Sequence, residues 1–194
     1  MEFVLGGAPD SERVAILAGS FNPPTIAHMQ LVDAARAHAD EVLCVLPRVF
    51  PHKHYFGATM QQRLEMLRTL GLSVALSEKG LFADIAQEVR VHYPRLKELS
   101  FLCGADAAER ILTWDYGDPH FAHRMLRHFN LLVAPRGSAF IPQEDFVQHV
   151  LPLDIGDDYH AVSSSEVRER VRSNQPWEHL VPPPIVEHVR SIYS

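Results

Sequence analysis

Residues 19–28 read Gly19-Ser-Phe-Asn-Pro-Pro-Thr-Ile-Ala-His28, and they connect an apolar run at 13–18 to a helical pattern that begins at Ile26. The apolar run predicts a buried strand, and apolar residues at helical spacing predict a helix to about Ala39. A strand that turns into a helix leaves backbone amides without partners, and these amides together with the helix dipole can bind an anion. The stretch therefore predicts a phosphate site at a strand–helix junction.

Several residues of this turn suit a phosphate ligand. Gly19 lets the backbone approach a ligand closely, and Pro23 and Pro24 stiffen the turn. Thr25 and His28 are three residues apart, so they share a face of the first helical turn. His28 can donate a hydrogen bond to a phosphate and stabilise negative charge that develops during a displacement. An ordinary capped helix that binds nothing explains the same residues, so the turn alone leaves both explanations open.

Strand and helix patterns alternate along most of the chain. Strands are expected at 13–18, 41–46, 73–76, 99–103 and 130–134, with a short last strand near 151–155. Helices are expected at 26–39, 59–70, 81–93, 163–172 and 184–193. This alternation predicts an α/β fold with a Rossmann-like, doubly wound parallel sheet of about five strands.

No repeat or linker divides the chain, so we expect a single domain over residues 1–194 with a small helical C-terminal part at about 159–194. Ligands of doubly wound sheets bind at the carboxyl ends of the strands, near the point where the strand order reverses. Gly19, Gly104 and Pro135 fall at such ends. The site is expected there.

The composition is ordinary for a globular protein, with 46% hydrophobic residues and a formal net charge of −6. The negative charge argues against broad binding to nucleic acid or to anionic membranes, so a phosphate must be held by a local site. Cys44 and Cys103 lie in apolar runs, as is typical of reduced thiols in the cytosol. The N-terminus lacks the pattern of a signal peptide, and no stretch has the apolar length of a membrane span. We expect a cytoplasmic protein with small-molecule partners.

Residues 19–28 resemble the (H/T)-x-x-H signature of the nucleotidyltransferase superfamily, and most closely that of the nicotinate- and nicotinamide-nucleotide adenylyltransferases. The bacterial pattern reads G-(G/S)-(T/S)-F-(D/N)-P-x-H-x-G-H. This chain has Thr25 where the first histidine usually stands and Ala27 in place of the glycine, while His28 is retained. Some members that make the NAD dinucleotide also carry threonine at this position.

Further segments follow in the order in which the family has them. Pro51-His-Lys53 resembles a Pro-His-Lys segment whose lysine approaches the ATP phosphates, and Gln62-Arg63 begins a match to the H-R-x-x-M-L helix of the family. Arg63 could make a structural ion pair or contact a ligand. The segment from Val162 to Arg168 resembles I-S-S-T-x-(I/V)-R, which implies a second anion-binding cradle.

The resemblance also covers the acceptor site. Gly104-Ala-Asp106 matches G-x-D, where the carboxylate would accept hydrogen bonds from ribose hydroxyls. Asp106 could instead cap the helix that follows it. Trp114 stands where family members stack an aromatic ring on the pyridine of the mononucleotide, although core packing is the other role open to a tryptophan.

The resemblance implies adenylyl transfer, in which the phosphate of a pyridine mononucleotide attacks the α-phosphorus of ATP and pyrophosphate leaves. His28, Lys53 and Arg168 would be the catalytic residues. The remaining residues of the ATP site would be Gly19, Ser20, Phe21, Asn22, Thr25, Ser163 and Ser164. Mg²⁺ is expected, held mainly by the ATP phosphates and water, with no metal site made by protein side chains.

The sequence leaves the identity of the acceptor substrate open. In the nicotinate enzymes a Tyr-Thr-x-x-Thr-Leu segment helps to bind the pyridine carboxylate, and the corresponding residues here, 78–84, lack this pattern. Nicotinate mononucleotide, nicotinamide mononucleotide and another phosphorylated acceptor are all compatible with the sequence. A nucleotide-binding module without catalysis is a further alternative. The sequence assigns no role to Arg136 and no oligomeric state, although a homo-oligomer is compatible with it.

Overall fold

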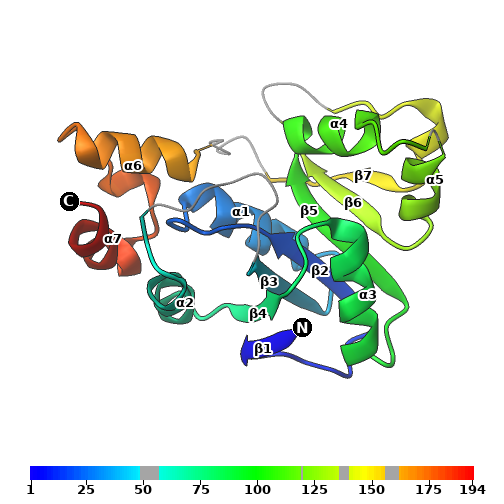
Figure 1. Cartoon of the computed structure of the whole chain (residues 1–194), viewed down its shortest axis with the longest axis horizontal. Coiled ribbons are helices and arrows are strands. Elements are labelled where there is room, and N and C mark those ends of the chain that lie inside the picture. The colour runs from blue at the N-terminus through cyan, green and yellow to red at the C-terminus, as the bar shows by residue number, and fades with distance from the viewer. Residues whose placement is uncertain (49–56, 119, 136–139, 156–161) are drawn as a thin grey trace.

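A computed structural model describes residues 1–194 except 49–56, 119, 136–139 and 156–161. Within this part of the chain, a seven-stranded sheet has the order β1-β4-β3-β2-β5-β6-β7 (Figure 1). All neighbouring strands are parallel except β1, which runs antiparallel to β4. The strands are β1 (Glu2–Leu5), β2 (Arg13–Ala18), β3 (Glu41–Pro47), β4 (Ser73–Ser77), β5 (Glu98–Gly104), β6 (Asn130–Ala134) and β7 (Val150–Pro152).

The predicted α/β class and parallel sheet are confirmed, but the prediction of about five strands was wrong. The first extra strand, β1, has four residues and lies at the edge of the sheet. An edge strand this short gives little hydrophobic alternation, and its pairing with β4 depends on residues far along the chain. The second, β7, has three residues and lies close to the short strand expected near 151–155.

The helices cover both faces of the sheet and form a separate group near the C-terminus, where α6 and α7 lie side by side (Figure 1). They are α1 (Ile26–Ala35), α2 (Met60–Thr69), α3 (Phe82–His92), α4 (Ala105–Thr113), α5 (Phe121–Leu126), α6 (Ser164–Arg172) and α7 (Val186–Tyr193). Short 3-10 turns occur at Glu144–Phe146, Glu178–Leu180 and Pro183–Ile185.

Two helix bounds differ from the expectation. Helix α1 ends at Ala35, not near residue 39, because the backbone tightens there into bonds between residues three apart, such as the Arg36 amide to the Asp33 carbonyl. Helix α7 begins at Val186, because residues 183–185 form a 3-10 turn in which the Ile185 amide donates to the Pro182 carbonyl. The short helix α5 was not predicted.

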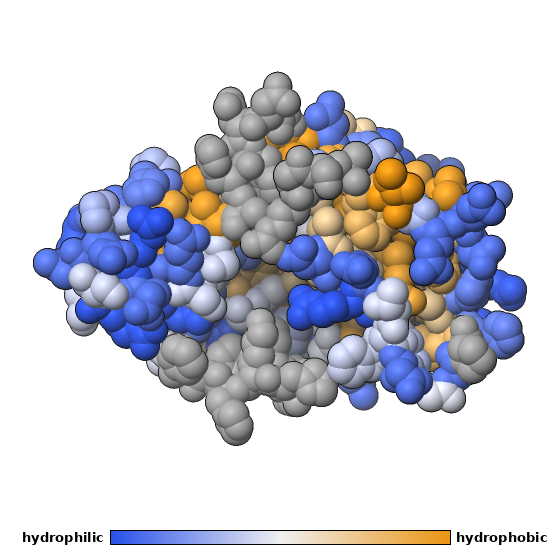
Figure 2. Space-filling model, turned by 90° about the horizontal axis from the view of Figure 1, so that it is seen from above, coloured by the Kyte–Doolittle hydropathy of each residue, from blue (hydrophilic) through white to orange (hydrophobic). Residues whose placement is uncertain are grey.

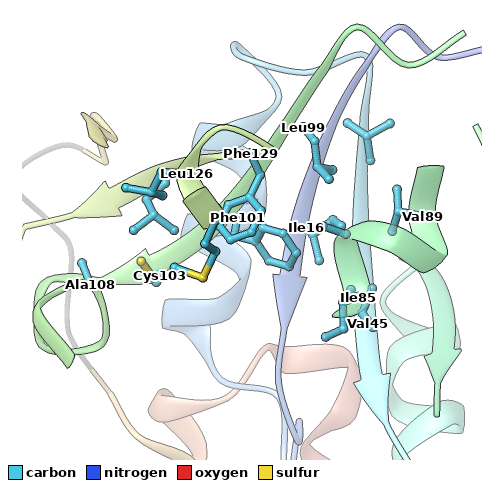
Figure 3. Close-up of a cluster of buried hydrophobic side chains, with 14 of the residues drawn as sticks. Ile16, Val45, Ile85, Val89, Leu99, Phe101, Cys103, Ala108, Leu126 and Phe129 are labelled. Atoms are coloured by element: carbon cyan, nitrogen blue, oxygen red, sulfur yellow. The ribbon is translucent and has the colours of Figure 1, made fainter. Parts of the chain in front are cut away.

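Burial on alternate sides of β2 shows why the sheet is doubly wound. Val14 and Ile16 belong to one core cluster, which includes residues of α3 and α5, and Ala15 and Leu17 belong to another, which includes residues of α1. Figure 3 shows the first cluster, with Phe101 near its centre. Successive side chains of a strand point to opposite faces, so both faces of β2 must be covered.

The order of the strands places the expected site. From β2 the chain adds β3 and then β4 on one side, and it then crosses to β5 on the other side of β2. The carboxyl ends of β2 and β5, which carry Gly19 and Gly104, are therefore neighbours at the point where the order reverses. This agrees with the expected position of the site in a doubly wound sheet.

At the amino ends of the parallel strands, a buried carboxylate joins three segments. The Tyr93 hydroxyl donates to Glu41 Oε2 at 2.7 Å, and the Ala8 amide donates to the same oxygen at 2.8 Å. Burial, followed by the hydrogen bond to Glu41, raises the pKa of Tyr93, so its hydroxyl stays a donor. This group fixes the start of β3 to the loop before β2 and to the end of α3.

We expect Tyr93→Phe to lower the free energy of unfolding by about 1–2 kcal/mol, because the buried carboxylate loses a donor. Urea unfolding followed by circular dichroism measures this change. The control Tyr116→Phe removes a half-buried hydroxyl that donates to the Ile111 carbonyl and should cost less. A Tyr93→Phe variant as stable as the wild type would contradict the assignment.

Candidate active site

The turn between β2 and α1 has limited backbone donors. The Gly19 amide donates to the Val45 carbonyl at 3.0 Å, and the Thr25 amide donates to His28 Nδ1 at 3.0 Å. Residues 23 and 24 are prolines and have no amide hydrogen. Within residues 19–25, the backbone amides that could bind an anion are therefore limited to those of Ser20, Phe21 and Asn22. Any contribution of Gly19 comes from its lack of a side chain.

Two features orient the turn. Phe21 has a φ of 46°, a left-handed conformation that is uncommon for a non-glycine residue, and its ring is buried against the ring of His28 at a centroid distance of 5.1 Å. The Ser20 carbonyl accepts a hydrogen bond from Arg63 Nη1 at 3.2 Å. Because the carbonyl and amide of a trans peptide point in opposite directions, the Phe21 amide is directed away from Arg63.

Arg63 is 4% exposed, and its Nε also donates to the Thr59 carbonyl at 3.4 Å. Of the two roles left open by the sequence, the hydrogen bonds to the Thr59 and Ser20 carbonyls favour a structural one. The guanidinium supports the turn from α2.

Thr25 and His28 form a reciprocal cap at the start of α1. The Thr25 amide and hydroxyl both lie within hydrogen-bond distance of His28 Nδ1, at 3.0 and 2.7 Å. Since an amide can only donate, Nδ1 accepts, and the neutral imidazole carries its proton on Nε2. Burial lowers the pKa of His28 from 6.5 to about 4, so the ring is neutral at pH 7. His28 is thus a neutral donor through Nε2.

The segment from Val162 to Arg168 meets the turn, as the resemblance implies. The Ser164 hydroxyl donates to the Pro23 carbonyl at 2.7 Å, and Arg168 Nη1 donates to the Asn22 carbonyl. The Thr25 hydroxyl also lies 3.3 Å from the Val162 carbonyl. Burial lowers the pKa of Arg168, but a guanidinium keeps its charge at any ordinary pH. A cation is therefore fixed beside the turn.

Ser163 acts at the start of α6. Its hydroxyl accepts the Glu166 amide at 3.1 Å, which is an ordinary N-cap. The Glu166 side chain forms a salt bridge with Arg170 at 2.9 Å. The structure therefore shows a structural role for Ser163, and a contact of Ser163 with ATP stays a prediction.

Asp106 and Trp114 lie on α4, which follows β5. The N-cap is Gly104, and Asp106 is exposed in the first turn, so it does not cap the helix. Trp114 ends the helix with 58% of its surface exposed and lines a cavity of about 560 Å³ together with the segment up to Asp118. This exposure excludes core packing as its role. A tryptophan that lines a cavity can stack on a planar ligand.

Other predicted residues lie elsewhere. Lys53, with Pro51 and His52, and Arg136 lie outside the described residues. Sequence reasoning gave no role to Tyr193, whose hydroxyl donates to Asn22 Oδ1 at 2.5 Å across 171 residues of chain. Its only signal in the sequence is its place in the last amphipathic helix.

Hydrophilic and apolar side chains lie next to one another around the centre of the face seen from above in Figure 2. Among the described residues, no group of three or more histidine, cysteine, aspartate or glutamate side chains could hold a metal ion. None of the helices in the described part of the chain is long and apolar enough to span a bilayer.

Comparisons with known proteins agree with this geometry. The model of the cytidylyltransferase-like family matches residues 16–170. A protein of Bordetella avium named as a probable nicotinate-nucleotide adenylyltransferase is 30% identical, with 92% of this chain and 95% of that protein covered. A protein of the same name from Carboxydothermus hydrogenoformans is 28% identical, with 91% and 94% covered.

Among solved structures, the chain is similar to the Plasmodium falciparum nicotinic acid mononucleotide adenylyltransferase complexed with NaAD. The TM-score is 0.70 at 18% identity, and the match covers 93% of this chain and 95% of the other. At this identity the likeness concerns the fold alone.

The depressed pKa of His28 gives a pH dependence of stability. Between pH 6.5 and about 4 the unfolded chain binds a proton at His28 that the folded chain does not, so the free energy of unfolding falls as the pH drops through this range. The loss should reach at most about 3 kcal/mol. Urea unfolding at pH 7 and pH 5 measures it.

His28→Asn is the matched variant, because asparagine Oδ1 can replace Nδ1 as the acceptor of the cap but does not titrate. The variant should lose less stability than the wild type between the two pH values. Equal losses would show that His28 is not the buried titrating group.

Proposed function

The chain belongs to the cytidylyltransferase-like family, and on this premise we propose that it is an adenylyltransferase of NAD biosynthesis that joins ATP to a pyridine mononucleotide. Nicotinate mononucleotide is the first candidate acceptor, since the relatives reported above carry that activity in their names. The observation that carries the proposal is the Thr25–His28 cap, which leaves the Nε2 proton of a neutral histidine as a donor at the end of β2.

In the proposed reaction, a phosphate oxygen of the mononucleotide forms a bond to the α-phosphorus of ATP, and the bond to the bridging oxygen of the β-phosphate breaks. The electron pair leaves with pyrophosphate. Such a displacement needs positioning and neutralisation of charge more than a protein nucleophile. His28, Arg168 and Lys53 would stabilise the charge on the transferring phosphoryl group.

The donors of the turn suit the oxygens of a triphosphate. The ATP ligands would be the turn residues Gly19, Ser20, Phe21, Asn22 and Thr25, together with Ser163 and Ser164. These residues offer backbone amides and hydroxyls, which would contact phosphate oxygens, and Gly19 leaves room for the ligand. Mg²⁺ would bring additional positive charge, held by the phosphates and by water.

The acceptor would lie over α4. Trp114, which is 58% exposed, would stack on the pyridine ring, and Asp106 would accept hydrogen bonds from the ribose. Small-molecule substrates, a cytoplasmic location and no binding of nucleic acid complete the proposal, with a homo-oligomer as a further possibility.

The test is pyrophosphate release from ATP with nicotinate mononucleotide, nicotinamide mononucleotide or phosphopantetheine. We expect turnover with at least one pyridine mononucleotide. His28→Asn should lower kcat about 100-fold, because it retains the cap and removes the Nε2 donor. Turnover with phosphopantetheine alone would show that the acceptor is not a pyridine mononucleotide. No turnover with any of the three acceptors would favour a nucleotide-binding module without catalysis.

Trp114→Ala should raise the KM for the mononucleotide about tenfold, because stacking on the indole is lost, and should leave the KM for ATP unchanged. Steady-state kinetics with each substrate varied in turn measure both constants. Val91→Ala removes an apolar side chain that is 80% exposed on α3 and serves as the control. Equal KM values for Trp114→Ala and the wild type would exclude stacking.

A further inference from the structure

The side-chain oxygen of Asn22 is a meeting point of three segments. The Ala58 amide donates to Asn22 Oδ1 at 3.1 Å, and the Tyr193 hydroxyl donates to it at 2.5 Å. A carbonyl oxygen has two lone pairs, so these donors together fix the plane of the Asn22 amide. The backbone carbonyl of the same residue accepts Arg168. Asn22 therefore joins the turn to α7, to α6 and to the segment before α2.

Gly57 shows that the approach of Tyr193 is close. Gly57 has a φ of +102°, and a Cβ there would lie 2.9 Å from a ring atom of Tyr193 and 3.0 Å from Asn22 Oδ1. No other residue could take this conformation without displacing the two side chains. Gly57 and Ala58 also follow directly after residues 49–56, which contain Lys53. The contact thus links the turn to Gly57 and Ala58, just before α2.

The Tyr193 hydroxyl is held in place and stays protonated. Tyr193 packs on a small apolar cluster made by α2, α6 and α7, which includes Met66, Val167 and Val189. Burial raises the pKa of its hydroxyl, so the proton stays in place at neutral pH. Packing from one side and the hydrogen bond from the other fix the ring beside Asn22.

We infer that Tyr193 is a positioning residue for ATP, which acts through Asn22 Oδ1 to hold the turn of residues 20–25 in the shape that presents its amides and His28 to the phosphates. The inference rests on the proposed function for its kinetic consequence. It assigns a role in the phosphate site to the last helix of the chain. If the role of Tyr193 were purely structural, its loss would lower the stability of the protein without changing the kinetic constants for ATP more than those for the mononucleotide.

Tyr193→Phe tests this inference, because it removes one hydroxyl and keeps the ring on Gly57. We expect kcat/KM for ATP to fall about tenfold and the KM for the mononucleotide to stay unchanged. Tyr93→Phe is the matched control, since it also removes a buried tyrosine hydroxyl that donates to an oxygen, but at the amino ends of the parallel strands. It should lower the melting temperature and leave both kinetic constants unchanged.

A double-mutant cycle with Asn22→Ala decides whether Tyr193 acts through Asn22. Asn22→Ala should lower kcat/KM for ATP at least as much as Tyr193→Phe, and the double variant should be no worse than Asn22→Ala alone. Effects that multiply, or a Tyr193→Phe variant with wild-type kinetics, would overturn the inference.

Binding of MgATP by titration calorimetry separates this inference from the proposed function. If the wild type turns over no acceptor, the proposed function fails, and the inference is then decided by whether Tyr193→Phe weakens ATP binding about tenfold. If the wild type is active and Tyr193→Phe matches it in both binding and turnover, the inference alone fails.

Discussion

The position of the β2–α1 turn is the constraint on which the rest of the site depends. Val14 and Ile16 are buried on one face of β2, and Ala15 and Leu17 on the other, with 4% exposure at most. A shift of one residue would exchange the two sets between faces of different shape, so the register of β2 is strongly fixed. The residue at which the chain leaves the sheet is fixed with it. This residue lies where the strand order reverses, beside the end of β5.

The turn is held through the carbonyls of three of its peptides. The carbonyls of Ser20, Asn22 and Pro23 accept side-chain donors from α2 and α6, which come from distant parts of the chain. Each of these bonds fixes the direction of one peptide. Since residues 23 and 24 are prolines, only the amide of Phe21 belongs to one of these three peptides and can donate. The shape of the turn therefore depends on α2 and α6 as well as on its own residues.

The sequence predicted the parts of the site that local patterns encode. Alternating strands and helices predicted the parallel sheet, and the spacing of Thr25 and His28 predicted their shared face. The resemblance predicted that Ser164 and Arg168 lie at the turn. No local pattern could show that their side chains donate to its carbonyls, because these carbonyls are 141 and 146 residues away in the sequence. The same reason applies to Tyr193, whose partner lies 171 residues away, and to β1, which depends on pairing with β4.

The threonine at position 25 changes what His28 can contribute. Its amide and hydroxyl both lie against Nδ1, and the buried ring stays neutral at pH 7. A neutral ring adds a directed hydrogen bond but no full charge to the site. In the proposed reaction, positive charge beside the triphosphate would come from Arg168, whose place beside the turn is fixed by hydrogen bonds, together with the expected metal ion and the proposed lysine. In a chain with a net charge of −6, a cation fixed beside the turn would favour the binding of phosphates there.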